Sequence, residues 1–493
     1  MKFLSTRGGF TVKNAAEAVT LGLSADGGLF VPETFPDLGG EIRNFLSMDY
    51  AERAAAIIGS FLEEYDKAGL LSACRAAYAK FEEGDAAPVV KISDGLFVLE
   101  LFHGPTLAFK DIALTLLPYL LRQGADITGV KETILILVAT SGDTGKAALE
   151  GFKDCKGVKI CVFYPSEGVS DMQKLQMCTQ EGGNVNVIGV KGNFDDCQTA
   201  VKKIFTSHDA ETELKKEGVV LSSANSINFG RLVPQIVYYF SAYCDLVNAG
   251  EKELGDPVDF TVPTGNFGNI LAGYYAKRMG LPIGKLVCAS NSNNVLTEFF
   301  LSGTYDANRE FFKTMSPSMD ILISSNLERL IFELTGRNAA LTAKRMEELK
   351  QFGKYSLSDD EKKIINKDFF ADYCDEEDCI TQIAKCFEDS GYLSDPHTAV
   401  ALKAAETYAA RTGSDAKMIV LSTASPYKFS QNVLRAISGK TVKDAFRAAA
   451  MLESESATPI PRQISALKDK KRIFDKVINK ADALKETLAF AAK

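Results

Sequence analysis

The sequence predicts an α/β protein built on parallel sheets that are flanked by helices. Through the middle of the chain, short apolar runs of strand length alternate with helix-like segments, as in parallel sheets with crossover helices. Several of these runs end in loops rich in Gly, Ser, Thr and Asn. At 493 residues the chain is too long for one simple core, so we expect two or three domains.

Eight segments are predicted strands and five are predicted helices. The strands are residues 97–101, 133–139, 158–164, 185–190, 219–222, 260–262, 286–289 and 418–422. The helices are residues 146–152, 194–205, 230–246, 270–279 and 428–437. We expect residues 1–90 to be mainly helical and residues from about 300 to 394 to form a charged, helical insertion. The tail, about 462–493, is predicted to form surface helices.

Composition excludes several classes of protein. Hydrophobic residues make up 46% and charged residues 24%, and the net charge of −8 argues against nucleic-acid binding. The N-terminus lacks the apolar core of a signal peptide, and the longest apolar runs are too short to span a membrane. Ten cysteines without a CxxC pair indicate reduced thiols, so we expect a cytoplasmic protein. Three scattered histidines argue against a histidine-rich metal site, and we assign no metal ligand.

Three loops after predicted strands carry ligand-binding features. Ser141-Gly142-Asp143-Thr144-Gly145 suits a carboxylate or phosphate, although a turn capped by Asp143 or Thr144 explains it equally well. Thr264-Gly265-Asn266-Phe267-Gly268-Asn269 matches neither a Walker A loop nor a dinucleotide fingerprint. Its backbone N–H groups form a good nest for a phosphate dianion, the alternative being a tight turn. The third strand ends in Ser422, Thr423 and Ser425, with Lys428 beyond. Because ligands bind at the carboxyl ends of parallel strands, we expect the loops to converge.

Lys110 lies among apolar residues at a fourth strand end, between Phe109 and Asp111. An apolar setting lowers a lysine pKa, which favours the neutral amine that attacks an aldehyde. The alternative is a lysine whose ammonium group reaches solvent. A reactive lysine near a phosphate nest, without a nucleotide motif, points to pyridoxal 5'-phosphate, which carries both an aldehyde and a phosphate.

The chain resembles the threonine synthases, pyridoxal-phosphate enzymes that share the fold of the tryptophan synthase β-subunit. The matching segments cover nearly the whole chain: GLSADGGLFVPETFP (22–36), LFHGPTLAFKD (101–111), ATSGDTGKAA (139–148), NSINFGRLVPQIVYY (225–239), VPTGNFGNILAGYYAKRMGLP (262–282), SPSMDILISSNLERLIFEL (316–334), DPHTAVA (395–401) and STASPYKF (422–429). The resemblance implies fold type II, with two open, mostly parallel sheets flanked by helices. We place a large cofactor domain at 91–130 and 223–493 and a small α/β domain at 131–222.

The resemblance also implies roles for individual residues. Lys110 matches the lysine that holds the cofactor and moves protons, and Gly265, Asn266, Phe267, Gly268 and Asn269 match the loop around the cofactor phosphate. Thr423 matches the hydroxyl that faces the ring nitrogen, and Asp143 stands where many relatives have Asn near the ring hydroxyl. On the substrate side, Arg231 matches a residue expected to meet the substrate phosphate. Asn228 and Lys428 are expected in the same pocket, and Ser141 and Thr144 at the substrate carboxylate. Ser425 replaces a histidine of many relatives, and His397 is expected to play a structural role.

The implied activity is that of a carbon–oxygen lyase that converts O-phospho-L-homoserine and water into L-threonine and phosphate, the last step of threonine biosynthesis. One alternative is a phospho-lyase that releases 2-oxobutanoate from the same substrate. Another is a sensing protein without activity, against which Lys110, Thr423 and the 265–269 loop argue. The resemblance further suggests a monomer or weak homodimer, with no nucleic-acid or membrane partner.

Overall fold

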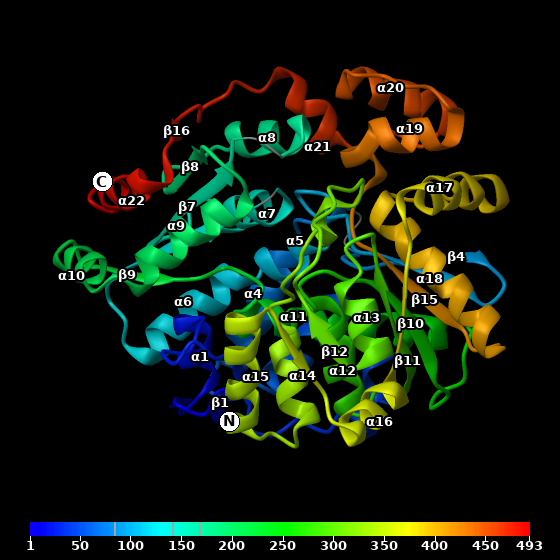
Figure 1. Ribbon diagram of the computed structural model, residues 1–493, viewed down its shortest axis with the longest axis horizontal. Coiled ribbons are helices and arrows are strands. Elements are labelled where there is room, and N and C mark those ends of the chain that lie inside the picture. Colours follow the sequence, from blue (N-terminus) through cyan, green and yellow to red (C-terminus); the bar gives the residue numbers. More distant parts are fainter. Residues whose placement is uncertain (83–84, 141, 167–168) are drawn as a thin grey trace.

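Two mostly parallel β-sheets, each covered by helices, lie side by side (Figure 1). The computed structural model describes residues 1–82, 85–140, 142–166 and 169–493. All eight strands predicted from the sequence are present, and they divide between the two sheets. The α/β class and the pair of mostly parallel sheets are therefore confirmed.

The larger sheet has six strands in the order β14-β11-β10-β15-β5-β4, of which only β4 runs antiparallel to its neighbour. Every residue of β10 and β15 is buried, which shows that both faces of the sheet are covered. The strands are β4 (Val89–Ser93), β5 (Leu96–Glu100), β10 (Val258–Pro263), β11 (Ile283–Ser290), β14 (Phe369–Tyr373) and β15 (Met418–Ser422).

Helices around the larger sheet supply its hydrophobic cover. The longest, α11, is buried along almost its whole length and packs against α3 and α12, while α18 lies against β10, β11 and β15. They are α5 (Lys110–Leu114), α6 (Leu117–Thr128), α11 (Phe229–Asn248), α12 (Gly268–Arg278), α13 (Val295–Ser302), α14 (Leu327–Leu334), α15 (Ala339–Phe352), α16 (Asp359–Asp368), α17 (Glu376–Ser390), α18 (Pro396–Thr412), α19 (Ser430–Ser438) and α20 (Ala445–Ser456).

The smaller sheet has five strands in the order β16-β8-β7-β6-β9, all parallel. Its strands are β6 (Thr133–Ala139), β7 (Val158–Pro165), β8 (Val185–Val190), β9 (Val219–Ser222) and β16 (Val477–Ile478). Its helices are α7 (Asp143–Phe152), α8 (Asp171–Cys178), α9 (Phe194–Thr206), α10 (His208–Lys216) and α22 (Ala483–Ala491). The C-terminal segment passes from α20 through α21 (Arg462–Ser465) to reach this sheet (Figure 1).

The sequence analysis did not predict some of the strands. The N-terminal region holds the expected helices α1 (Ala15–Leu21), α2 (Ile42–Phe45), α3 (Tyr50–Gly59) and α4 (Lys67–Tyr78), but also a small antiparallel sheet of β1 (Phe3–Ser5), β2 (Thr11–Val12) and β3 (Phe30–Pro32). The charged insertion is helical apart from a two-stranded antiparallel sheet, β12 (Thr304–Asp306) with β13 (Lys354–Ser356), and the edge strand β14. No helix among the described residues has the length and apolar character needed to cross a membrane.

Candidate active site

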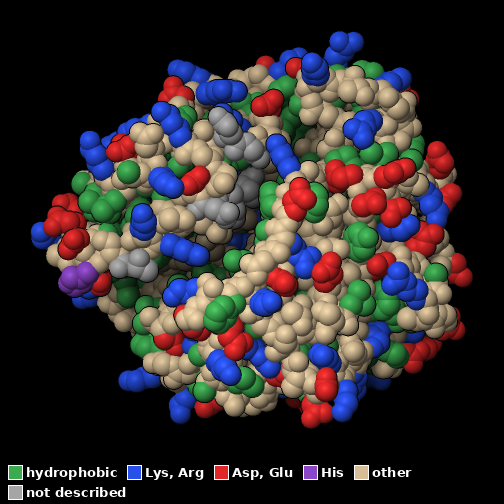
Figure 2. All heavy atoms as spheres, viewed as in Figure 1, with side chains coloured by type: hydrophobic (Ala, Val, Ile, Leu, Met, Phe, Trp, Pro, Cys, Tyr) green, Lys and Arg blue, Asp and Glu red, His purple; other side chains and the backbone are tan. Residues whose placement is uncertain are grey.

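Three neighbouring strands of the larger sheet, β5, β15 and β10, end at the same edge because they are parallel. The loops that follow β5 and β15 touch: the Phe109 N–H donates to the Thr423 carbonyl at 2.9 Å, and Ala108 forms an isolated bridge with Ala424. The loops that carry Lys110 and Thr423 therefore converge, and residues 264–269 follow β10 at the same edge of the sheet. Figure 2 shows this face of the molecule hollowed between the two sheets, with Lys and Arg side chains along the hollow.

Lys110 is the first residue of α5, and its side chain is 13% exposed. Its Nζ lies 3.5 Å from the Ser318 Oγ and 3.9 Å from an oxygen of Asp143. Burial, with repulsion from Lys428 and Arg231, lowers the pKa of Lys110 to about 8, although Asp143 partly opposes the change. A substantial fraction of this amine is therefore neutral near physiological pH, as nucleophilic and proton-transfer chemistry require.

Asp143 comes from the smaller sheet, as the first residue of α7, and joins the two halves of the site. Lys428 Nζ lies 2.6 Å from its Oδ1, and the Gln173 amide donates to the same oxygen at 2.9 Å. Burial opposes ionisation of Asp143, but Lys428 and Lys110 hold the pKa of this carboxyl well below its usual range. Lys428 also donates to the Thr106 carbonyl at 3.0 Å, so its ammonium group has two partners within the protein.

Ser318 is a central residue of the site that sequence reasoning did not assign. Its Oγ donates to the Asp143 Oδ2 at 3.3 Å, and its N–H donates to the His397 Nε2 at 3.2 Å. His397 in turn places its ring proton on Nδ1, 2.6 Å from the buried Asp395 carboxylate that caps α18. Ser318 follows no predicted strand, and the only signal was its place inside the segment 316–334 of the family resemblance.

The loop before α12 has the geometry of an anion cradle. Phe267 adopts a left-handed backbone conformation with φ 62°, a strained state that costs about 1–3 kcal/mol and clusters at ligand-binding loops. The backbone N–H groups of residues 266–269 donate to no described residue, and they stand at the N-terminus of an 11-residue helix. A Cβ on Gly265 would come within 2.9 Å of the Ser318 carbonyl oxygen, so only glycine lets this loop approach the segment that contacts Lys110.

Two further predicted residues have polar groups without a protein partner. Thr423 is 5% exposed, and its hydroxyl makes no hydrogen bond to another described residue. Arg231 is 2% exposed, and burial lowers the pKa of its guanidinium to about 10. Its Nη1 donates to the Ala224 carbonyl at 2.6 Å, but its buried Nε has no partner among the described residues. A buried, unpartnered N–H of a cation is suited to an anionic ligand.

The remaining predicted residues lie less centrally. Asn228 caps α11, and its amide group donates to the carbonyls of Val19 and Ser223 while its oxygen accepts from Gly230. Its side chain is thus fully used within the fold, and its contact with a substrate stays a prediction. Thr144 is half-buried in the first turn of α7. Ser141 lies outside the described residues.

The group of donors fits pyridoxal phosphate. A free N–H cradle at a helix N-terminus suits the phosphate, a partly neutral lysine suits the aldehyde, and the unpartnered Thr423 hydroxyl suits the ring nitrogen. These groups follow the carboxyl ends of the neighbouring strands β10, β15 and β5, at one edge of the sheet.

Known proteins agree with this geometry. Three family models match the chain: "Threonine synthase N terminus" at residues 2–78, "Pyridoxal-phosphate dependent enzyme" at 87–350 and "Threonine synthase, C-terminal" at 398–488. Human "Threonine synthase-like 1" is 42% identical over 449 residues, which cover 88% of this chain and 59% of that protein. Threonine synthase of Pseudomonas aeruginosa is 38% identical over 471 residues, which cover 94% of this chain and 97% of that protein.

Solved structures give the same result across the whole chain. A pyridoxal-phosphate-bound threonine synthase from Brucella melitensis has a TM-score of 0.87 at 37% identity, and the match covers 100% of both chains. Threonine synthase from yeast has a TM-score of 0.87 at 34% identity and 99% coverage of both chains. This chain belongs to the threonine synthase family of pyridoxal-phosphate-dependent enzymes.

Proposed function

We propose that this protein converts O-phospho-L-homoserine and water into L-threonine and phosphate. The observation that carries the proposal is Arg231, a fully buried guanidinium with an unpartnered Nε whose charge acts on Lys110. A second anion site beside the reactive lysine, separate from the phosphate cradle before α12, suits a substrate that brings its own phosphate. The bacterial and yeast relatives that are named threonine synthases support the same substrate.

Lys110 is the residue that moves protons in this proposal. With its pKa near 8, it is partly neutral, so it can accept the Cα proton of the substrate and later return a proton. Asp143, 3.9 Å away, stabilises the charged form that results from proton uptake. The Ser318 hydroxyl, which contacts both groups, restrains the position of the amine between proton transfers.

The other residues bind and orient. Pyridoxal phosphate, when bound, supplies the electron sink that makes loss of the Cα and Cβ protons feasible. The N–H groups of residues 266–269 would hold the cofactor phosphate, and Thr423 would meet the ring nitrogen through a hydroxyl that need not keep it protonated. Arg231 would hold the substrate phosphate until it leaves, and the first turn of α7, which contains Thr144, would receive the substrate carboxylate.

A product assay tests the proposal. The holoenzyme is incubated with O-phospho-L-homoserine, and phosphate, L-threonine and 2-oxobutanoate are measured together. We expect equal amounts of phosphate and threonine; phosphate with 2-oxobutanoate would assign the phospho-lyase reaction instead. Lys110→Ala should lose both turnover and the absorbance of the lysine-bound cofactor, whereas the exposed Lys131→Ala control should keep both.

Location and assembly complete the proposal. All ten cysteines are free thiols, which supports a reducing compartment such as the cytoplasm. We keep the division into a small domain at 131–222 and a large domain at 91–130 and 223–493; β16 and α22, near the C-terminus, join the smaller sheet and are its exceptions. A monomer or weak homodimer is proposed from the family resemblance, and sedimentation of the purified protein would test it.

A further inference from the structure

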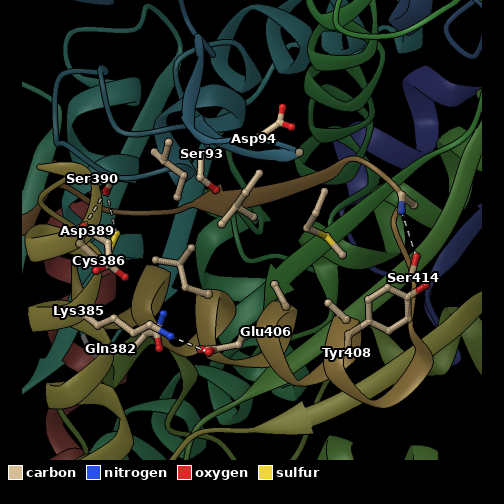
Figure 3. Close-up of a pocket in the computed structure, with 18 of the residues that line it drawn as sticks. Ser93, Asp94, Gln382, Lys385, Cys386, Asp389, Ser390, Glu406, Tyr408 and Ser414 are labelled. Atoms are coloured by element: carbon tan, nitrogen blue, oxygen red, sulfur yellow. Dashed lines mark hydrogen bonds and ion pairs between the residues drawn. The ribbon is translucent and has the colours of Figure 1, made fainter.

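A second cavity, of about 450 Å³, lies at the opposite end of the larger sheet from Lys110 (Figure 3). It is enclosed by the turn between β4 and β5, the facing sides of α17 and α18, and the loop before β15. Its lining includes Leu96 and Met418, the first residues of β5 and β15, whereas Lys110 and Thr423 follow the last residues of those strands. The cavity is therefore distinct from the candidate active site, and its volume is in the range of small-molecule sites.

The lining combines an apolar interior with an acidic rim. Ile92, Leu402 and Ala405 contribute apolar surface. Four carboxylates and one ammonium group also line the cavity: Asp94, Asp389, Glu406 and Asp415, with Lys385. Lys385 is paired with Glu406 at 2.6 Å, and Asp94 lies 3.6 Å from the Lys91 Nζ, so two of the four carboxylates have a cationic partner. Asp389 and Asp415 form no ion pair within the described part of the chain. The excess of negative charge favours a cationic ligand and disfavours an anion.

Gln382 gives an independent indication of a ligand. The residue is 9% exposed and lines the cavity, and its side chain makes no hydrogen bond to another described residue. In Figure 3 it lies next to Lys385 and Glu406, on the α17 side of the cavity. Polar side chains in folded proteins are paired with protein groups, water or ligands, and the Gln382 amide has no protein partner among the described residues, so it is available to a ligand in the cavity.

We propose that this cavity is a second small-molecule site, which binds a planar cation of the amidinium or guanidinium type joined to an apolar body. A planar fork of N–H donors matches a carboxylate such as Asp389 and the carbonyl oxygen of Gln382. The apolar body fills the space between Leu402, Ala405 and Met418, where burial of hydrocarbon is favourable.

Benzamidine is a suitable probe, because benzamide has nearly the same shape without the charge. We expect calorimetry with the holoenzyme to give a Kd for benzamidine of about 1 mM or tighter, as expected for a ligand of this size. Benzamide should bind at least about tenfold more weakly, because hydrogen bonds to charged groups are roughly twice as strong as neutral ones. The absorbance of the bound cofactor, recorded in the same titration, should not change.

Two matched pairs of variants locate the site. Ala409→Phe places a ring at the exposed rim of the cavity and should weaken benzamidine at least about tenfold, whereas Ala410→Phe, next along α18 and outside the lining, should not. Asp389→Asn should weaken it about fivefold, and Glu388→Gln should have no effect. Equal affinity for benzamide, binding that survives Ala409→Phe, or an altered cofactor absorbance would each overturn the proposal. Failure of the activity proposed above would leave these affinities unchanged.

Discussion

Replacing Asp143 by Asn tests how the site sets the protonation of its lysine. In the structure, this carboxylate lies 3.9 Å from the Lys110 Nζ and 2.6 Å from the Lys428 Nζ, and the three side chains are 2%, 13% and 0% exposed respectively. Asn has nearly the same shape but no charge, so the substitution removes the attraction that favours charged Lys110. Lys428 then repels Lys110 without a counterion, which acts in the same direction.

The distance sets the size of the effect. Two unit charges about 4 Å apart interact with about 4 kcal/mol at an effective dielectric constant of about 20. One pKa unit corresponds to about 1.36 kcal/mol, so the full attraction is equivalent to a fall of about three in the pKa of Lys110. Lys110 is 13% exposed, so solvent screens part of this attraction, and we expect the pKa of Lys110 to fall from about 8 by about one to three.

The rate of cofactor capture measures this pKa. After the cofactor is stripped with hydroxylamine, the rate of pyridoxal phosphate binding is followed by absorbance between pH 5.5 and pH 9.5, because only the neutral amine attacks the aldehyde. For the unaltered enzyme the rate should rise with pH to a midpoint near 8. For Asp143→Asn the midpoint should move to lower pH, since loss of a negative charge favours the neutral amine.

Two further variants make the result decisive. Asp143→Asn combined with Lys428→Met removes both the attraction and the repulsion, so its midpoint should lie between the other two. Asp126→Asn, an exposed change on α6, should leave the midpoint unchanged. A midpoint for Asp143→Asn at or above that of the unaltered enzyme would refute the assignment of Asp143 as the counterion of Lys110.

Two other predictions concern substrate binding and stability. Arg231→Gln should raise the KM for O-phospho-L-homoserine at least about tenfold, because it removes a charge-assisted contact of about 1.5–3 kcal/mol. The cofactor absorbance should stay the same. An unchanged KM in steady-state assays would show that Arg231 does not bind the substrate. Asp395→Ala should lower the free energy of unfolding by about 3 kcal/mol, because it removes a helix cap and leaves the buried His397 unpaired. The exposed cap Asp375→Ala should cost only about 1 kcal/mol in the same denaturant titration, and equal losses would show that the His397 pair adds nothing.

The strands around the site were predictable because each is a buried run with a clear end. Residues 133–139 and 418–422 are almost wholly apolar because helices cover both faces of these strands. A continuous apolar run of this length is easy to identify as a buried strand. Strand β14 was missed because Phe369–Tyr373 lies at a sheet edge within a charged segment and mixes buried with exposed residues. The strands of the N-terminal sheet have only two or three residues, too few to show a period.

The site was predictable to the extent that its residues follow strand ends. Lys110, Thr423 and the 265–269 loop do so, and the sheet order brings them together. Ser318 does not, because it lies about 50 residues beyond the nearest of these loops and reaches the site through a long-range contact. The pairing of Lys428 with Asp143 was also missed. A sequence shows that both residues are charged, but it does not show whether the lysine binds a substrate anion or a buried carboxylate.

The chain passes between the two sheets three times, after α6, after β9, and again between α20 and β16. The third passage is anchored at both ends: Ala449 and Leu452 of α20 are buried, and the Ile473 N–H donates to the Cys178 carbonyl before β16 pairs with β8. Two connecting segments alone would allow the two sheets to rotate relative to each other about a hinge. A third connecting segment, attached elsewhere, restricts that rotation. Any opening between Asp143 and Lys110 must then follow one restricted path, and shortening the 457–476 segment would change how far the site opens without altering a residue within it.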